Sequence, residues 1–363
     1  MVTFAEKLAR IPHYEAGAAS VQDAAREVVG DVVQLASNES PFGPVEEVVE
    51  AVRREVASVN RYPDPAALAL RTAIADRFDL PLARIAVGNG SCEILLAAAE
   101  ALLEPESEIV YAWPSFSMYP HLSAITGAEE VRVPLSAGDV HDLEALRFAI
   151  TERSLMVVLS NPNNPTGTHL PAADIAAFVE KVPRRVLVVL DEAYIEFQLA
   201  EYPDASLALL GRYPNLVVLR TFSKVYGLAG LRVGYALGSE EFRVAVDRVR
   251  QPFAVNRLAQ AAATEAIRHQ DDVARRVERN ATERLWIGEQ LDELELSAAE
   301  SQANFFWLDL GDNDEAEVVA ELHRRGVAVR AGTGLGGPGH LRITYGTRPE
   351  NERLMEALQE IVS

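Results

Sequence analysis

From residue 85 onward, short runs of aliphatic and β-branched residues alternate with longer segments whose apolar positions recur at helical spacing. The short runs are IAVG at 85–88, EIVYAW at 108–113, LMVVLS at 155–160, RVLVVLD at 185–191, NLVVLRT at 215–221 and RVGYALG at 232–238. Helix-like segments such as SCEILLAAAEALL at 91–103 and PAADIAAFVEK at 171–181 lie between them. Near-continuous apolar strands separated by amphipathic helices indicate a mostly parallel sheet covered on both faces. The pattern therefore predicts a large, doubly wound α/β domain.

The pattern changes after residue 255. A helical stretch with a polar face runs from 256 to 294, and it leads to ANFFWLDL, a helix near 315–325, VAVR, a glycine-rich loop and LRITYG. Strand, helix, strand, strand predicts a smaller α+β domain. We expect residues 1–45 to form an N-terminal arm that contributes to the small domain, 46–255 the large domain, and 256–363 the small C-terminal domain.

The composition narrows the class of protein. With 48% hydrophobic and 24% charged residues, the 363-residue chain has the make-up of a globular protein and is long enough for two unequal lobes. No apolar stretch reaches the roughly eighteen residues that a membrane helix needs, and residues 1–15 mix charges into every turn, unlike a secretory signal. We therefore expect a cytoplasmic protein that does not span a membrane.

The net charge and the number and spacing of the cysteines and histidines argue against further classes of protein. The formal net charge of −20 disfavours nucleic acid and anionic lipid as partners, although a cleft lined by a few arginines can still attract small anions. Cys92 is the only cysteine, so the chain forms no intramolecular disulfide and no thiolate metal cluster. The seven histidines include no H-x-x-x-H or H-E-x-x-H pair, and we expect no metal site.

The strongest candidate chemistry lies in TFSKVYGLAGLRVGY at 221–235, directly after a predicted strand. It places Thr221, Ser223 and Lys224 at the carboxyl end of that strand, with Arg232 eight residues later. Ligands of open α/β sheets bind outside those ends. Hydroxyls and a guanidinium suit a phosphate, and a lysine beside them is able to form an imine. A single lysine in a loop is usually only solvated, so the prediction depends on its neighbours.

A second signal is RVLVVLDEAYIEF at 185–197, in which Asp191 ends an apolar strand and Tyr194 follows three residues later. Burying a carboxylate at the end of a strand costs free energy unless a cation pairs with it. A protonated pyridine nitrogen is such a cation, and the opposite charge of Asp191 would keep it protonated. Helix capping by Asp191 is an equally ordinary reading of this residue when it is taken alone.

Two further motifs fit a ligand site, and one does not. SNPNNPTG at 160–167 follows a strand and contains three asparagines, more than a plain turn requires. GNGSCEIL at 88–95 places glycines before a helix start that would expose N–H groups to an anion, but Glu93 replaces the third glycine of a dinucleotide fingerprint. The glycines at 332, 334 and 337 satisfy G-x-G-x-x-G, yet a proline and another strand follow, which predicts a flexible loop.

Taken together, NPNNPTG, DEAY, SKVYGLAGLRVG and LRITYGT resemble, in this order and spacing, the fold-type I pyridoxal phosphate aminotransferases. The resemblance is greatest to the histidinol-phosphate aminotransferases and the related aromatic aminotransferases, and it runs from IPHY near the start to LRITYGT near the end. It implies that Lys224 carries pyridoxal phosphate and moves a proton between the substrate and the cofactor. It also implies that Asp191 contacts the pyridine nitrogen, and that Tyr194 and Asn164 contact the phenolic oxygen.

The resemblance also implies a cup for the cofactor phosphate, a stacked ring and a shared dimer site. The residues matching the cup are Thr221, Ser223 and Arg232, with the backbone of Ser91 and Cys92. Phe116 matches the aromatic ring that stacks on the cofactor, where tyrosine is common. Tyr62 matches a residue that reaches the cofactor phosphate of the neighbouring subunit, so a homodimer is implied. Cys92 departs from the acidic residue that is usual there, and only a backbone role carries over.

The substrate contacts follow from the same resemblance. Arg342 matches the arginine that grips the α-carboxylate of glutamate, a task suited to its planar fork. Arg330 and Tyr14 match positions at the phosphate end of the substrate in the histidinol-phosphate enzymes, and both also occur in the aromatic relatives. Asn164 is expected to contact the substrate as well as the cofactor.

We therefore expect a transaminase that uses glutamate and 2-oxoglutarate as one pair of substrates, with histidinol phosphate and imidazole acetol phosphate as the favoured second pair. An aromatic amino-acid transaminase is the main alternative. A related phospho-amino-acid decarboxylase and a regulatory protein that holds the cofactor without turnover are more remote alternatives. The latter usually carries a DNA-binding extension, which neither the short arm nor the acidic charge suggests.

Overall fold

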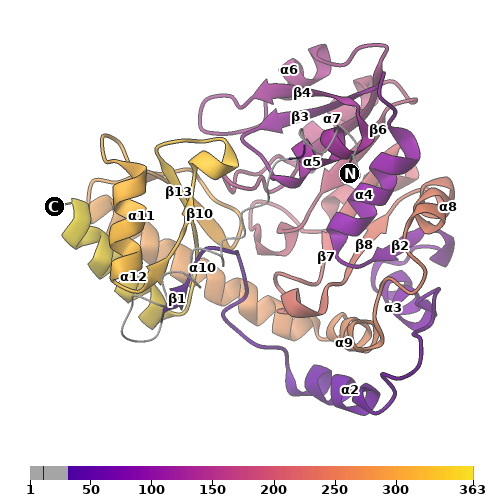
Figure 1. Ribbon diagram of the computed structural model, residues 1–363, viewed down its shortest axis with the longest axis horizontal. Helices are drawn as coiled ribbons and strands as arrows, with labels where there is room; N and C mark the ends of the chain where they lie inside the picture. Colours follow the sequence, from indigo (N-terminus) through magenta and orange to yellow (C-terminus); the bar gives the residue numbers. More distant parts are fainter. Residues whose placement is uncertain (1–10, 12–31, 363) are drawn as a thin grey trace, which may run out of the picture.

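The structure of the protein is a computed structural model that describes residue 11 and residues 32–362. A large lobe and a small lobe lie side by side, and the long helix α10 runs between them (Figure 1). Among the described residues, no helix combines the length and the apolar character that crossing a membrane requires.

A seven-stranded sheet forms the centre of the large lobe, in the order β2-β8-β7-β6-β5-β3-β4. Its strands are β2 (Ile85–Gly88), β3 (Glu108–Trp113), β4 (Glu129–Pro134), β5 (Ser154–Ser160), β6 (Leu187–Asp191), β7 (Leu216–Thr221) and β8 (Gly234–Leu237). Only β8 runs in the direction opposite to the other strands of this sheet. The predicted α/β class with a mostly parallel sheet is confirmed.

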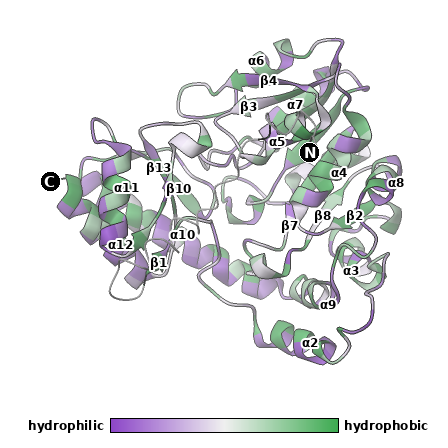
Figure 2. Cartoon of the chain, viewed as in Figure 1, coloured by the Kyte–Doolittle hydropathy of each residue, from purple (hydrophilic) through white to green (hydrophobic). Residues whose placement is uncertain are grey.

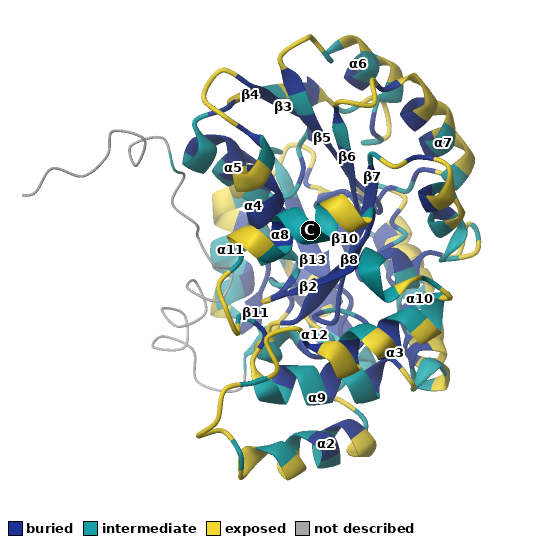
Figure 3. Cartoon of the chain, turned by 90° about the vertical axis from the view of Figure 1, so that its right-hand side faces the viewer, coloured by how far each residue is buried: buried dark blue, intermediate teal, exposed yellow. Residues whose placement is uncertain are grey.

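Helices cover both faces of this sheet because side chains alternate between the faces along each buried strand. One face packs against α3 (Leu68–Phe78), α6 (Leu143–Phe148), α7 (Ala172–Lys181) and α9 (Arg257–Ala266). The other face packs against α4 (Ser91–Leu102), α5 (Met118–Thr126) and α8 (Glu240–Val249). The helices turn buried faces toward the sheet and exposed faces outward (Figure 3). Helix α2 (Glu46–Val56) lies farther out and packs on α9.

The small lobe has its own apolar core. A four-stranded sheet in the order β12-β13-β10-β9 packs against three helices. Its strands are β9 (Ser297–Ala298), β10 (Phe305–Asp309), β12 (Arg330–Ala331) and β13 (His340–Thr344), and its helices are α10 (Gln270–Glu293), α11 (Glu315–Arg324) and α12 (Arg348–Val362). Hydrophilic residues dominate α10, whereas α4 of the large lobe is mainly hydrophobic (Figure 2). β1 (Val33–Gln34) pairs in parallel with β11 (Val327–Ala328).

Several elements differ from the pattern-based expectations. The predicted helical stretch 256–294 is two helices, α9 and α10, separated by residues 267–269. The run VAVR is divided between β11 and β12, which join different sheets. Strand β4 was not predicted, because as an edge strand it carries charges in place of an apolar run. The glycine-rich segment contains a short 3-10 helix, Thr333–Leu335, and leads into β13.

The domain boundaries remain a prediction. The core of the large lobe continues past residue 255, because apolar residues of α9 and Val273 at the start of α10 pack within it. Most of the predicted arm lies outside the described residues, and its described part attaches to the small lobe through β1.

Candidate active site

A pocket of about 400 Å³ lies between the two lobes, at the carboxyl ends of β5, β6 and β7. Parallel strands end at one edge of a sheet, which is where open α/β sheets bind ligands. The predicted site residues that line the pocket are Ser91, Cys92, Phe116, Asn164, Asp191, Tyr194, Thr221, Ser223, Lys224, Arg232, Arg330 and Arg342. Tyr62 lies elsewhere on the subunit, and Tyr14 falls outside the described residues.

Lys224 lies in the turn that follows β7, and its side chain is mostly buried. Nζ donates to the backbone oxygen of Ser37 at 3.2 Å and lies 5.5 Å from the centre of the Tyr194 ring. Burial, followed by the nearby positive charge of Arg342, lowers the pKa of the Lys224 amine to about 8. The neutral form of this amine is therefore more abundant near pH 7 than in an ordinary lysine, and the neutral form is the one that acts as a nucleophile.

Asp191 ends β6 and is only 5% exposed. Its Oδ2 accepts a hydrogen bond from the Tyr119 hydroxyl at 3.1 Å, whereas Oδ1 is buried with no hydrogen-bond partner among the described residues. Burial raises the pKa of Asp191 to about 6, and the hydrogen bond from Tyr119 partly opposes that rise. A buried carboxylate with an unused acceptor oxygen is costly by itself, so this position fits a cationic or N–H-bearing ligand group.

Tyr194 and Asn164 lie together and connect to Arg342. The Tyr194 hydroxyl accepts from Asn38 Nδ2 at 3.1 Å and from Asn164 Nδ2 at 3.5 Å. Asn164 Oδ1 accepts from Arg342 Nη1 at 2.7 Å, and Arg342 Nη2 donates to the Ala36 backbone oxygen at 2.7 Å. These contacts fix the guanidinium of Arg342, which is 8% exposed, in the wall of the pocket.

Hydroxyls, a guanidinium and a helix start converge at one end of the pocket. The Thr221 hydroxyl donates to Ser223 Oγ at 3.0 Å, and Arg232 Nη1 donates to the same oxygen at 3.3 Å. Helix α4 begins at Ser91, and the first N–H groups of a helix have no intrahelical acceptor. The chain can approach this closely because Gly90 lacks a Cβ, which would lie 2.5 Å from Arg232 Nη2. The result is an anion cup.

Phe116 and Arg330 also line the pocket. Phe116 packs edge-on against Tyr119, with ring centres 5.8 Å apart. Arg330 of β12 lies directly opposite Arg342 of β13 in the antiparallel register. Whereas Arg342 makes two hydrogen bonds, the Arg330 guanidinium makes no hydrogen bond or ion pair with the residues described by the structure.

Tyr62 is 78% exposed and stacks on Phe253 with ring centres 4.5 Å apart. It contributes to a surface hollow with residues 59–63, 252–253 and 256–258 and does not reach the pocket around Lys224 of its own subunit. The geometry within one chain does not bring Tyr62 to this pocket, and its predicted contact across a dimer stays a prediction.

The sequence did not predict that three polar groups belong to the site: Asn38, Tyr119 and the backbone oxygen of Ser37. Tyr119 lies three residues after Phe116 in the same motif, but nothing in the sequence indicates that it contacts Asp191. Asn38 comes from the arm and is far from Tyr194 in the chain. The polar turn SNES after an apolar segment was the available signal for Ser37 and Asn38.

These residues fit the cofactor implied by the resemblance. The free acceptor of Asp191 suits a protonated ring nitrogen, the cup around Ser223 and Arg232 suits a phosphate, and Lys224 lines the same pocket. The donor groups of Tyr194 and Asn164 are available at the side of the pocket for a phenolic oxygen.

Comparison with known proteins identifies the family. Residues 30–358 match the family described as aminotransferase class I and II. The chain is 41% identical over 360 residues to a histidinol-phosphate aminotransferase of Brevibacillus brevis, covering 99% of this chain and 98% of that protein. It is 42% identical over 356 residues to an aromatic amino acid aminotransferase of Streptomyces coelicolor, covering 98% and 96% of the two chains.

A solved structure supports the same assignment. The crystal structure of histidinol-phosphate aminotransferase from Sinorhizobium meliloti in complex with pyridoxal 5'-phosphate has a TM-score of 0.89 and 29% sequence identity, covering 100% of this chain and 98% of that chain. The protein therefore belongs to the class I and II aminotransferases, and it is a transaminase of fold type I that depends on pyridoxal phosphate.

Proposed function

We propose that this transaminase transfers the amino group of histidinol phosphate to 2-oxoglutarate, which gives imidazole acetol phosphate and glutamate and serves histidine biosynthesis. The observation that carries the proposal is the position of Arg330. A predicted cytoplasmic location belongs to the same proposal.

Arg330 and Arg342 occupy directly opposed positions of β12 and β13, and both line the pocket. Like charges at such positions repel each other, so the pair is favourable only when an anion offsets the repulsion. Arg342 already has two acceptors, whereas the Arg330 guanidinium has none among the described residues. This favours a substrate with an anionic group remote from the reacting carbon: the phosphate of histidinol phosphate, or the side-chain carboxylate of glutamate.

The residues around Lys224 then have separate tasks. When bound, pyridoxal phosphate supplies an electron sink that stabilises negative charge on the substrate α-carbon. Asp191 keeps the ring nitrogen protonated, because a carboxylate at close range favours the charged form. Tyr194 and Asn164 would contact the phenolic oxygen, and Phe116 would stack on the ring. Lys224 holds the cofactor and moves the proton, a task that its lowered pKa suits.

Arg232 and Arg342 each anchor one reactant, the cofactor and the substrate respectively. Thr221, Ser223 and Arg232, with the N–H groups of Ser91 and Cys92, hold the cofactor phosphate. Arg342 binds the α-carboxylate of glutamate and is itself oriented by Asn164. Anchoring both reactants aligns one substrate bond with the ring and removes part of the entropic barrier. The role that the resemblance implies for Tyr14, contact with the phosphate end of the substrate, is part of this proposal, although Tyr14 lies outside the described residues.

The exposed Tyr62 supports a homodimer with shared active sites. An exposed tyrosine stacked on another exposed ring, as Tyr62 is on Phe253, is typical of a surface that meets a partner. In the proposed dimer Tyr62 contacts the cofactor phosphate of the neighbouring subunit.

Turnover of histidinol phosphate and of phenylalanine, each with 2-oxoglutarate, tests the substrate assignment. We expect kcat/KM for histidinol phosphate to exceed that for phenylalanine, and Arg330→Gln to reduce the first by about tenfold or more with little effect on the second. Arg324→Gln is a matched control, since Arg324 is exposed on α11. A wild-type preference for phenylalanine would overturn the assignment.

An aromatic amino-acid transaminase is the second candidate. Phe116 and Leu335 supply apolar contacts on the wall of the pocket, and one of the similar proteins carries that name. In that case Arg330→Gln would leave phenylalanine turnover unchanged, and histidinol phosphate would be a poor substrate for the wild type.

A further inference from the structure

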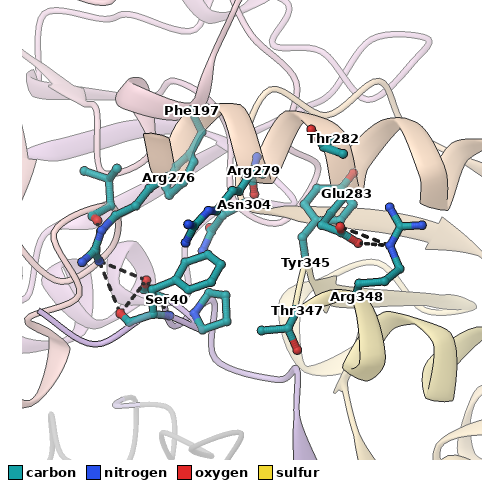
Figure 4. Close-up of a pocket in the computed structure, with 15 residues that line it drawn as sticks. Ser40, Phe197, Arg276, Arg279, Thr282, Glu283, Asn304, Tyr345, Thr347 and Arg348 are labelled. Carbon is teal, nitrogen blue, oxygen red and sulfur yellow. Dashed lines mark hydrogen bonds and ion pairs between the residues drawn. The ribbon is translucent and has the colours of Figure 1, made fainter. Parts of the chain in front are cut away.

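A second cavity, of about 250 Å³, lies between α10, the segment Ser40–Phe42 and the beginning of α12 (Figure 4). Its floor is formed by side chains that are at most 5% exposed: Phe197, Val225, Asn304 and Tyr345. Its rim is formed by exposed residues, among them Arg279 and Thr282. A buried, largely apolar floor below a polar rim is the usual form of a small-molecule site.

The charged groups of this cavity differ in what they contact. Arg276 donates to the backbone oxygens of Val225 and Gly43 and pairs with Asp272, so its guanidinium is fully engaged. Arg348 pairs with Glu283 at 3.1 Å. Arg279 has neither a hydrogen bond nor an ion pair among the described residues.

The guanidinium of Arg279 lies 4.9 Å from the centre of the Phe42 ring, which holds it at the mouth of the cavity. The cavity therefore offers one cation that is not neutralised by a protein carboxylate. Three arginines and one glutamate line the cavity, in a chain whose formal net charge is −20. This local excess of positive charge favours an anionic ligand.

Size and polarity define the ligand further. An apolar cavity of about 150 Å³ accommodates a benzene ring, so this cavity has room for a somewhat larger ring system. At its floor Asn304 Oδ1 is buried without a hydrogen-bond partner within residues 32–362, and a ligand N–H would satisfy it. A single planar guanidinium at the mouth suits a carboxylate. The complementary ligand is a small, flat aromatic carboxylate with an N–H donor.

We propose that this cavity is a second binding site for a small heteroaromatic carboxylate, and that its occupancy is communicated to the active site through Asn304 and Asn38. Asn304 Nδ2 donates to the Asn38 backbone oxygen at 3.2 Å, and Asn38 Nδ2 donates to the Tyr194 hydroxyl at 3.1 Å. Val225 of the cavity floor directly follows Lys224 in the chain. A ligand that shifts Asn304 or Val225 therefore moves groups that contact the reacting centre.

Titration calorimetry of the full-length holoenzyme with indole-3-carboxylate as the probe tests the site. We expect one binding event per chain, weakened by about tenfold or more in Arg279→Gln because a charge-assisted contact is lost. Thr282→Trp, which fills the rim from an exposed position, should block binding. Arg275→Gln is the matched control, since Arg275 lies on the same helix, is exposed, and does not line the cavity.

The outcomes distinguish binding of the probe at the second site from binding at the active site. A probe bound in the active site would bind all variants equally well, and that result, or the absence of binding to the wild type, overturns the proposal. Communication is measured as the rate at which glutamate changes the absorption of the bound cofactor. Saturating probe should change this rate in the wild type and in Arg275→Gln but not in Thr282→Trp, in which the site is blocked. An unchanged rate with bound probe refutes the communication.

Discussion

Lys224 is expected to capture pyridoxal phosphate with a pH dependence set by its buried position. Burial, with Arg342 as the second cause, lowers the pKa of its amine from 10.5 to about 8. Only the neutral amine attacks an aldehyde. At pH 7 a pKa of about 8 leaves roughly 9% of the amines neutral, against roughly 0.03% for an ordinary lysine. The environment of Lys224 therefore makes the reactive form about 300-fold more abundant, equivalent to about 3 kcal/mol.

The assay is stopped-flow absorbance of apoenzyme mixed with the cofactor between pH 6 and pH 10. Nα-acetyl-lysine under the same conditions is the reference amine, so that titration of the cofactor itself cancels in the ratio of the two rates. The covalent capture rate of the enzyme should rise about tenfold per pH unit below pH 8 and level off above it, while that of the reference continues to rise. Lys224→Ala should show no covalent capture.

The reasoning fails if the enzyme and the reference amine show parallel profiles up to pH 10, because Lys224 would then titrate as a solvated lysine. A second variant separates the causes of the lowered pKa. Arg342→Gln removes the positive charge but keeps Lys224 buried, so the plateau should move only part of the way toward pH 10.5. A plateau that does not move at all would assign the whole effect to burial.

Three further predictions concern residues of the proposed site. Burial raises the pKa of Asp191 from 3.8 to about 6, so stability falls as pH rises through that window and the cost, about 3 kcal/mol, is complete above it. Asp191→Asn should therefore raise the melting temperature of the apoprotein at pH 7 and slow transamination by about a hundredfold or more. Arg232→Gln should weaken cofactor affinity, measured by equilibrium dialysis, by about tenfold or more. Tyr62→Ala should leave the protein folded, because Tyr62 is exposed. Mixed dimers of one Tyr62→Ala subunit and one Lys224→Ala subunit should be more active than either variant homodimer, because one of their two shared sites has both native residues.

Exposed residues of the same type provide the controls. Asp174→Asn, Arg212→Gln and Tyr202→Ala change the same chemical groups outside the pocket and should leave each measured quantity unchanged. A destabilised Asp191→Asn apoprotein would contradict the assigned burial cost. Unchanged cofactor affinity in Arg232→Gln would remove that residue from the phosphate cup. Mixed dimers no more active than the homodimers would exclude a shared site.

The sequence by itself determined the fold class and the edge of the sheet where the site lies. Asp191 and Thr221 each end an apolar run, and the carboxyl ends of parallel strands meet at one edge, so their proximity follows from local pattern alone. The same holds for Ser91 and Cys92, because the start of a helix after a strand presents free N–H groups to that edge.

Only the tertiary structure decided which distant groups complete the site. Arg342 meets Asn164 and the backbone of Ala36, and Asn38 meets Tyr194, across separations that no local pattern encodes. The lowered pKa of Lys224 and the raised pKa of Asp191 likewise depend on burial, which is a property of the packed chain. Residue types and their spacing specify which chemical groups are available. Desolvation and long-range hydrogen bonds set the pKa values and the orientation of those groups, and both exist only in the packed chain.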